Sequence, residues 1–181
     1  MQIRDEIDAE IYSVGAELID SPFFQKAKQQ KHHRRSTLDA HVHAVARWSV
    51  RLCNYYERKG KRVNRKQVII AALCHDLGMI GREEKYARTT QAWRKHPGES
   101  ERLAAQYFPE IRESTLKSIH RHMWPLTLVP PLSLEQRILS RADKLASVGD
   151  VFHRKKRTPS SGREKVREGY PRRQRGRNSR K

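Results

Sequence analysis

Cysteines and long hydrophobic runs are both scarce in this sequence of 181 residues. The longest apolar run, Val68 to Leu73, is far shorter than the roughly 20 residues that a membrane-spanning helix needs. The first residues lack the basic-then-apolar pattern of a secretory signal. The two cysteines, Cys53 and Cys74, lie in helical patterns, which indicates buried thiols rather than a disulfide or a zinc ribbon. We therefore expect a cytoplasmic protein without a membrane segment.

Acidic residues are also few, since 20 Asp and Glu stand against 39 Lys and Arg, for a net charge of +19. Residues 154–181 contain 13 Lys and Arg and 2 Glu, which is a net charge of +11. Their only aliphatic or aromatic residues are Val166 and Tyr170, too few to offset the entropy cost of ordering. We expect a disordered basic tail, either a solvated arm or a nonspecific contact to nucleic acid.

The two-residue alternation of exposed strands is missing, and the patterns are helical instead. The clearest helix covers residues 37–59, and further helices are expected at residues 2–19, 23–31, 64–78, 97–108, 111–123 and 133–151. Asn64 with Gln67 and Ser133 with Gln136 resemble capping boxes at helix starts, and Pro97 suits a first helical position. Residues 78–96 are expected to form a loop. The sequence predicts one all-α domain.

Ionisable residues stand where these patterns predict burial. They lie on an apolar helix face, at helix ends or within the last helix: His41, His75, Asp76, His96, His122 and Asp143. An unpartnered buried charge is costly, and a shared divalent metal supplies a partner. Imidazole nitrogens with carboxylate oxygens favour Mn, Fe, Co, Ni or Zn over Mg or Ca.

The order of five motifs resembles the HD superfamily of metal-dependent phosphohydrolases, close to an uncharacterised bacterial subgroup. The motifs are His41-Val-His-Ala-Val-Ala46, Ala71-Ala-Leu-Cys-His-Asp-Leu-Gly78, Lys95-His-Pro97, Ile119-His-Arg-His-Met-Trp-Pro-Leu-Thr127 and Arg141-Ala-Asp-Lys144. The resemblance covers about residues 36–152. It implies a compact HD-domain helical bundle at residues 36–153, preceded by a helical extension at residues 1–35.

The resemblance also implies the ligands. A first metal site would use His41, His75, Asp76 and Asp143. With His96 and His122 added, six ligands would hold two ions, with Asp76 bridging them. Relatives that bind two ions often have two adjacent histidines at this motif, whereas here His122 is followed by Met123. The sequence therefore leaves open whether the site holds one ion or two.

The function implied is hydrolysis of a nucleotide or another small phosphorylated metabolite by a metal-activated water. Asp76 would orient the water, and Lys95 and Lys144 would face the phosphate. The alternative is a nucleic-acid-binding or nucleotide-sensing protein in which the basic tail is the working part and the HD domain is a scaffold. Neither the substrate nor the oligomeric state follows from the sequence.

Each of these residues also has an ordinary structural interpretation. His41 alone would be a satisfied core histidine, His96 a residue before a helix start, and Asp143 a partner for a neighbouring arginine. Trp93 and Trp124 could stack on a base, but packing in a small helical core is the commoner role of such residues.

Overall fold

A computed structural model describes residues 2–31 and 36–152, with only the backbone at residues 150–152. Within these ranges all regular structure is helical, apart from one β-bridge between Lys31 and Thr37. The predicted all-α class is confirmed. None of the described helices has the length and apolar character needed to span a membrane. The predicted basic tail at residues 154–181 lies outside the described ranges.

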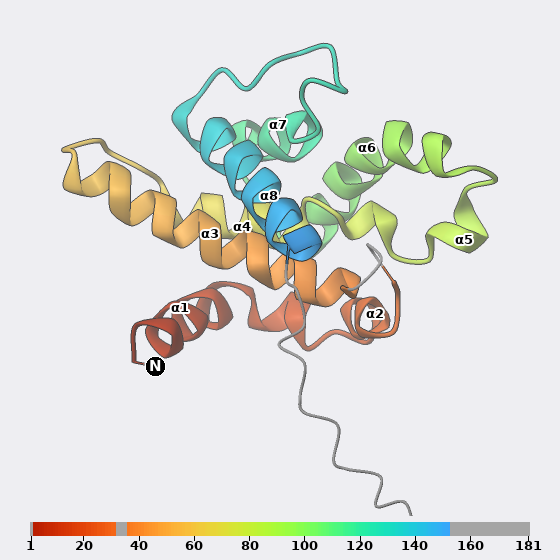
Figure 1. Cartoon of the computed structure of the whole chain (residues 1–181), viewed down its shortest axis with the longest axis horizontal. Helices are drawn as coiled ribbons and strands as arrows, with labels where there is room; N and C mark the ends of the chain where they lie inside the picture. The colour runs from red at the N-terminus through yellow and green to blue at the C-terminus, as the bar shows by residue number, and fades with distance from the viewer. Residues whose placement is uncertain (1, 32–35, 153–181) are drawn as a thin grey trace, which may run out of the picture.

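Eight α-helices and two 3₁₀ turns make up the described part of the chain (Figure 1). The helices are α1 (Gln2–Ile19), α2 (Pro22–Gln25), α3 (Leu38–Arg58), α4 (Arg65–Cys74), α5 (Arg82–Lys85), α6 (Thr89–Tyr107), α7 (Glu113–Arg121) and α8 (Leu134–Phe152). The 3₁₀ turns are η1 (Lys26–Lys28) and η2 (Leu77–Met79).

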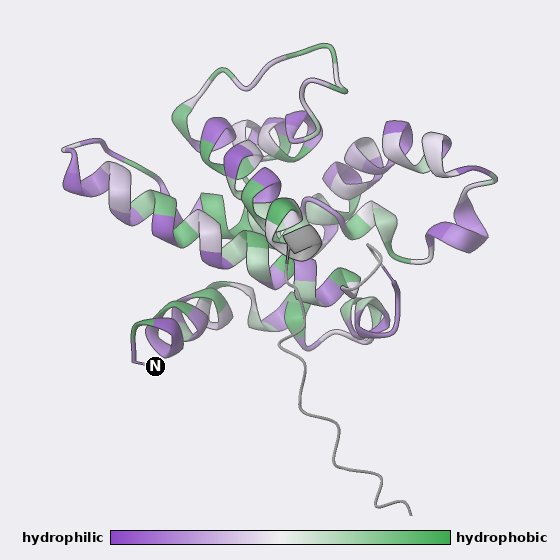
Figure 2. Ribbon diagram, in the orientation of Figure 1, coloured by the Kyte–Doolittle hydropathy of each residue, from purple (hydrophilic) through white to green (hydrophobic). Residues whose placement is uncertain are grey.

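Helix α4 is the centre of the bundle. Every residue from Val68 to Cys74 is buried. Helices α1, α3, α7 and α8 all pack against it, and α3 crosses α8 beside it (Figure 1). The hydrophobic residues of α3 lie mainly near the crossing with α8, whereas the C-terminal end of α3 is polar (Figure 2). A helix that is apolar all round is stable only when it is covered on every side.

The residues predicted as an N-terminal extension share this core. Ile7, Ile11 and Leu18 of α1 are buried in the same hydrophobic cluster as α4. Gly15 permits the close contact, because a Cβ there would lie 2.2 Å from Cδ1 of Leu73. Helix α1 therefore helps to hold α4, and with it the residues that follow α4, in place.

The predicted caps at Asn64 and Ser133 are present. The Oδ1 atom of Asn64 accepts a hydrogen bond of 3.2 Å from the backbone N–H of Gln67, and Oγ of Ser133 accepts one of 3.2 Å from that of Gln136. The side chain of Gln67 does not complete a reciprocal capping box. Its Oε1 atom accepts from the hydroxyl of Thr115 at 2.5 Å, which ties α4 to α7.

Three predicted elements have the wrong bounds. The helix predicted at residues 64–78 ends at Cys74, and η2 follows it. Helix α6 begins at Thr89 rather than at Pro97, so much of the expected loop at residues 78–96 is helical and Pro97 lies inside a helix. Ala92, His96 and Ser100 form a buried stripe at four-residue spacing that begins before the proline. These side chains are small or polar, so hydropathy alone does not reveal the stripe. Residues 23–31, expected as one helix, form α2 and η1.

Candidate metal centre

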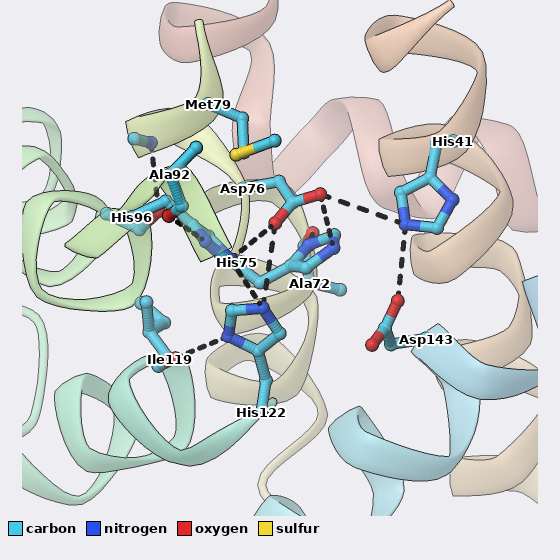
Figure 3. A network of polar contacts seen from close by, with 12 residues as sticks. His41, Ala72, His75, Asp76, Met79, Ala92, His96, Ile119, His122 and Asp143 are labelled. Atoms are coloured by element: carbon cyan, nitrogen blue, oxygen red, sulfur yellow. Dashed lines mark hydrogen bonds and ion pairs between the residues drawn. The ribbon is translucent and has the colours of Figure 1, made fainter. Parts of the chain in front are cut away.

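Asp76 directly follows the end of α4, and its carboxylate faces four histidines (Figure 3). His75 is the C-cap of α4, and at Asp76 the backbone leaves helical geometry, with φ −113° and ψ 14°. His41 comes from α3, His96 from α6, and His122 directly follows α7. Asp76 is only 4% exposed, so its charge needs partners inside the protein.

The two oxygens of Asp76 face two different groups of histidines. Oδ2 lies 3.5 Å from Nε2 of His75 and 3.9 Å from Nε2 of His41. Oδ1 lies 3.2 Å from Nε2 of His96 and 3.6 Å from Nε2 of His122. Within each group the potential ligand atoms all lie within 4.8 Å of one another. Two groups of three residues therefore share one carboxylate: the first group is His41, His75 and Asp76, and the second group is Asp76, His96 and His122.

Backbone carbonyl groups fix the orientation of three of these histidines. The Nδ1 atoms of His75, His96 and His122 each donate to a carbonyl oxygen three or four residues earlier, at 2.8, 2.9 and 2.6 Å. A carbonyl oxygen only accepts, so Nδ1 carries the hydrogen in each ring. In the neutral ring Nε2 then presents a lone pair toward Asp76, which is how metal-binding histidines are commonly held.

The electrostatics favour a bound cation. Burial lowers the pKa of His75 to about 4, so this ring is neutral, and its buried Nε2 has no hydrogen-bond partner in the described part of the chain. Burial raises the pKa of Asp76, but the surrounding imidazoles, His75 foremost, lower it well below its ordinary value. Burial lowers the pKa of His122, but the hydrogen bond to Asp76 and the negative charges of Asp76 and Asp143 together raise it above its ordinary value.

A divalent transition metal fits this donor set. The Nε2 atoms of His96 and His122 lie 3.2 Å apart beside an ionised carboxylate, and Nε2 of His75 has a free lone pair. Imidazole nitrogens with carboxylate oxygen are the ligands preferred by Mn, Fe, Co, Ni and Zn. The residues can therefore hold an ion at either group.

Asp143 reaches the centre through His41. On α8, its Oδ1 atom lies 3.2 Å from Nε2 of His41, and its side chain is 16% exposed. Burial raises the pKa of Asp143, but the hydrogen bond with His41 and the neighbouring imidazoles of His75 and His122 together lower it below its ordinary value, so the carboxylate is ionised. Asp143 belongs to neither group of three residues. Asp143 is placed either to orient the His41 ring or to serve as an additional ligand for an ion held by the first group.

A cavity of about 300 Å³ opens beside the second group. Its polar lining consists of Asp76, His96, His122, Asp143, Lys144 and Ser147. Its apolar lining consists of Met79, Trp93, Met123, Trp124, Pro125 and Leu126. Sequence reasoning missed most of the apolar wall. The signal that could have revealed it is the uncharged run at residues 123–133, directly after a candidate ligand.

The predicted cationic residues are placed differently. Lys144 lines the cavity, and its Nζ atom donates to Oγ of Ser140 at 2.7 Å. Lys95 is exposed and is not part of the cavity wall, because adjacent helical positions differ by about 100° and α6 turns His96 inward. The two tryptophans are not simple packing residues: Trp93 is 49% exposed and Trp124 is 40% exposed, both at the cavity.

Two further histidines pair elsewhere. Nε2 of His43 lies 3.4 Å from Asp39, one turn away on α3. The exposed His120 lies with Nδ1 2.8 Å from Glu101 on α6. Neither belongs to the groups around Asp76.

Gly78 lets the segment after Asp76 approach α6. A Cβ at this position would lie 2.4 Å from the carbonyl oxygen of His96 and 3.0 Å from Cβ of Glu99. The backbone N–H of Gly78 donates to Oγ of Ser100 at 2.9 Å. Only glycine permits this contact without displacing the helix that carries His96.

The family model of the HD domain matches residues 38–148, which is more than half of the chain. The chain belongs to the HD domain family. No match was found among curated proteins or among solved structures. The resemblance to the metal-dependent phosphohydrolases of the HD superfamily is thereby confirmed. HD domains bind divalent metals, and the two groups around Asp76 lie within the matched residues.

Proposed function

We propose that this HD domain hydrolyses a phosphate ester or anhydride in a nucleotide or another small phosphorylated metabolite. One or two divalent transition metal ions would be held by His41, His75, Asp76, His96, His122 and Asp143. The observation that carries the proposal is the shared carboxylate, because each oxygen of Asp76 faces its own group of histidine nitrogens beside an open cavity. Ions held by these residues would stabilise the negative charge that develops in a phosphoryl transfer.

When bound, a divalent ion lowers the pKa of water toward about 7 and neutralises charge on phosphoryl oxygens. The chain's own groups complete the site. Asp76 stays ionised because the imidazoles lower its pKa, so it can orient a water molecule by accepting its hydrogen bond. The ammonium group of Lys144 on the cavity wall supplies a positive charge for the phosphate.

Phosphate release from a panel of nucleotides and other phosphorylated metabolites by the metal-loaded protein tests this proposal. We expect turnover of at least one compound by the native chain and by His120→Ala, whose histidine lies outside the centre. Asp76→Ala, which removes the carboxylate common to both groups, should lose turnover together with bound metal. Full metal loading without turnover of any compound would contradict hydrolysis and favour a sensing role.

A further inference from the structure

Exposed hydrophobic side chains concentrate on the loop between α7 and α8, part of which lines the cavity. Among the described residues, the large exposed hydrophobic side chains of this loop are Trp124, Leu126, Leu128, Val129 and Leu132, and Trp93 of α6 lines the same cavity. Leu126 is 71% exposed and Leu128 is 99% exposed. Residues 123–133 contain no charged side chain, although 33% of the whole chain is charged. Hydrophobic stretches are visible on the loop that joins α7 to α8 (Figure 2).

This apolar surface continues into the cavity that holds the candidate ligands. Trp93, Met123, Trp124 and Leu126 line the cavity together with His96 and His122. Apart from the candidate ligands, the polar side chains on the wall are Lys144 and Ser147 alone. Such a wall offers extensive contact area to an apolar group but few hydrogen bonds to a sugar or to the edge of a base.

Lys144 joins the polar and the apolar sides of the cavity. Its Nζ atom lies 5.5 Å from the centroid of the Trp124 ring and donates to Ser140. The hydroxyl of Ser140 donates in turn to the carbonyl oxygen of His122 at 3.4 Å. A phosphate that meets Lys144 and the metal ligands would therefore lie close to the Trp124 ring.

We propose that the site selects phosphoesters whose organic group is apolar or aromatic and packs against Trp93, Trp124 and Leu126. This inference rests on the proposed phosphohydrolase function and narrows its substrate class. In the reaction, a bond forms between the water oxygen and phosphorus, the bond from phosphorus to the ester oxygen breaks, and the alcohol leaves with a proton. The apolar wall binds the group that leaves.

Binding of non-hydrolysable alkylphosphonates, from methyl to octyl, to the metal-loaded full chain tests this selection. Burial of each methylene should tighten binding about threefold to fourfold until the wall is covered. Trp124→Ala should weaken octylphosphonate by at least about tenfold more than methylphosphonate, because the short compound reports the phosphate contact alone. Trp124→Phe should restore most of this gradient, which is the increase in affinity with alkyl chain length.

Leu128→Ala is the matched control, because Leu128 lies in the same loop but does not line the cavity. It should leave the gradient unchanged. A flat gradient in the native chain would overturn the proposal, as would discrimination of more than about tenfold among the four common nucleoside monophosphates, which requires hydrogen-bond recognition. A gradient without hydrolysis of any ester would support the selection and contradict the proposed reaction.

Discussion

The Nε2 atoms of His96 and His122 lie 3.2 Å apart, although both Nδ1 atoms donate to backbone carbonyl groups. In the neutral rings this arrangement brings two lone pairs together next to Oδ1 of Asp76. Mutual repulsion of three electron-rich atoms in a buried site is costly unless a positive charge lies among them. A proton on His122, whose pKa is raised beside Asp76, can supply that charge, and so can a metal ion.

The shared carboxylate predicts different losses from different ligand variants. His122→Ala should weaken binding at the second group by more than about tenfold and spare the group of His41 and His75. Asp76→Ala should weaken binding at both groups. The metal content of dialysed protein, measured by mass spectrometry, separates these outcomes, with the exposed His120→Ala as control. Equal losses in the two ligand variants would argue for one ion that uses both groups.

Metal removal should destabilise the folded protein, because His75 and its neighbours lose their shared partner. At an ion concentration about 100 times the dissociation constant, binding adds about 2.7 kcal/mol to the free energy of unfolding. For a domain of this size the melting temperature should fall by roughly 5–10 °C when a chelator is added. Asp76→Ala, which removes the carboxylate shared by both groups, should melt at the same temperature with and without chelator. A native protein that is insensitive to the chelator would contradict the metal site.

Gly78→Ala should damage the centre without changing a ligand. The new methyl group would meet the carbonyl oxygen of His96 at 2.4 Å, which forces α6 away from η2. We expect a loss of about 1–3 kcal/mol in the free energy of unfolding, measured by urea denaturation, and weaker metal binding at the second group. Gly149→Ala on α8 is the control, because nothing lies within 4 Å of its added Cβ. Unchanged metal affinity in Gly78→Ala would contradict this prediction, because it would show that α6 accommodates the methyl group without displacing His96.

Much of the fold follows from local sequence patterns. The caps at Asn64 and Ser133 and the buried run of α4 are encoded within a few residues, so they could be predicted. The start of α6 could not. Its inner face is built from Ala92, His96 and Ser100, whose burial depends on contact with η2 rather than on their own hydropathy.

The candidate site was partly predictable for the same reason. Histidines on apolar faces and at helix ends indicate ligands, since burial of an ionisable group needs a cause. Lys95 shows the limit, because proximity to His96 in sequence does not place its side chain in the cavity. The exposure of Trp93 and Trp124 depends on how α6 and the loop after α7 meet in space, which no local pattern encodes.

The basic tail predicts binding of nucleic acid that depends on salt. Residues 154–181 carry 13 Lys and Arg, which can contact phosphates without sequence preference. Affinity for a mixed DNA or RNA duplex should fall by more than about tenfold between 50 and 200 mM salt. A chain that ends after Phe152 should lose this binding in a fluorescence anisotropy titration. The same affinity with and without the tail would contradict the prediction.

Anomalous X-ray scattering from crystals of the metal-loaded protein tests the metal centre most directly. We expect an anomalous peak at about 2.0–2.2 Å from an oxygen of Asp76 and from Nε2 of His75, His96 or His122, with a second peak on the other oxygen if two ions bind. A metal-loaded crystal whose anomalous peaks all lie away from Asp76 would contradict the metal centre described here.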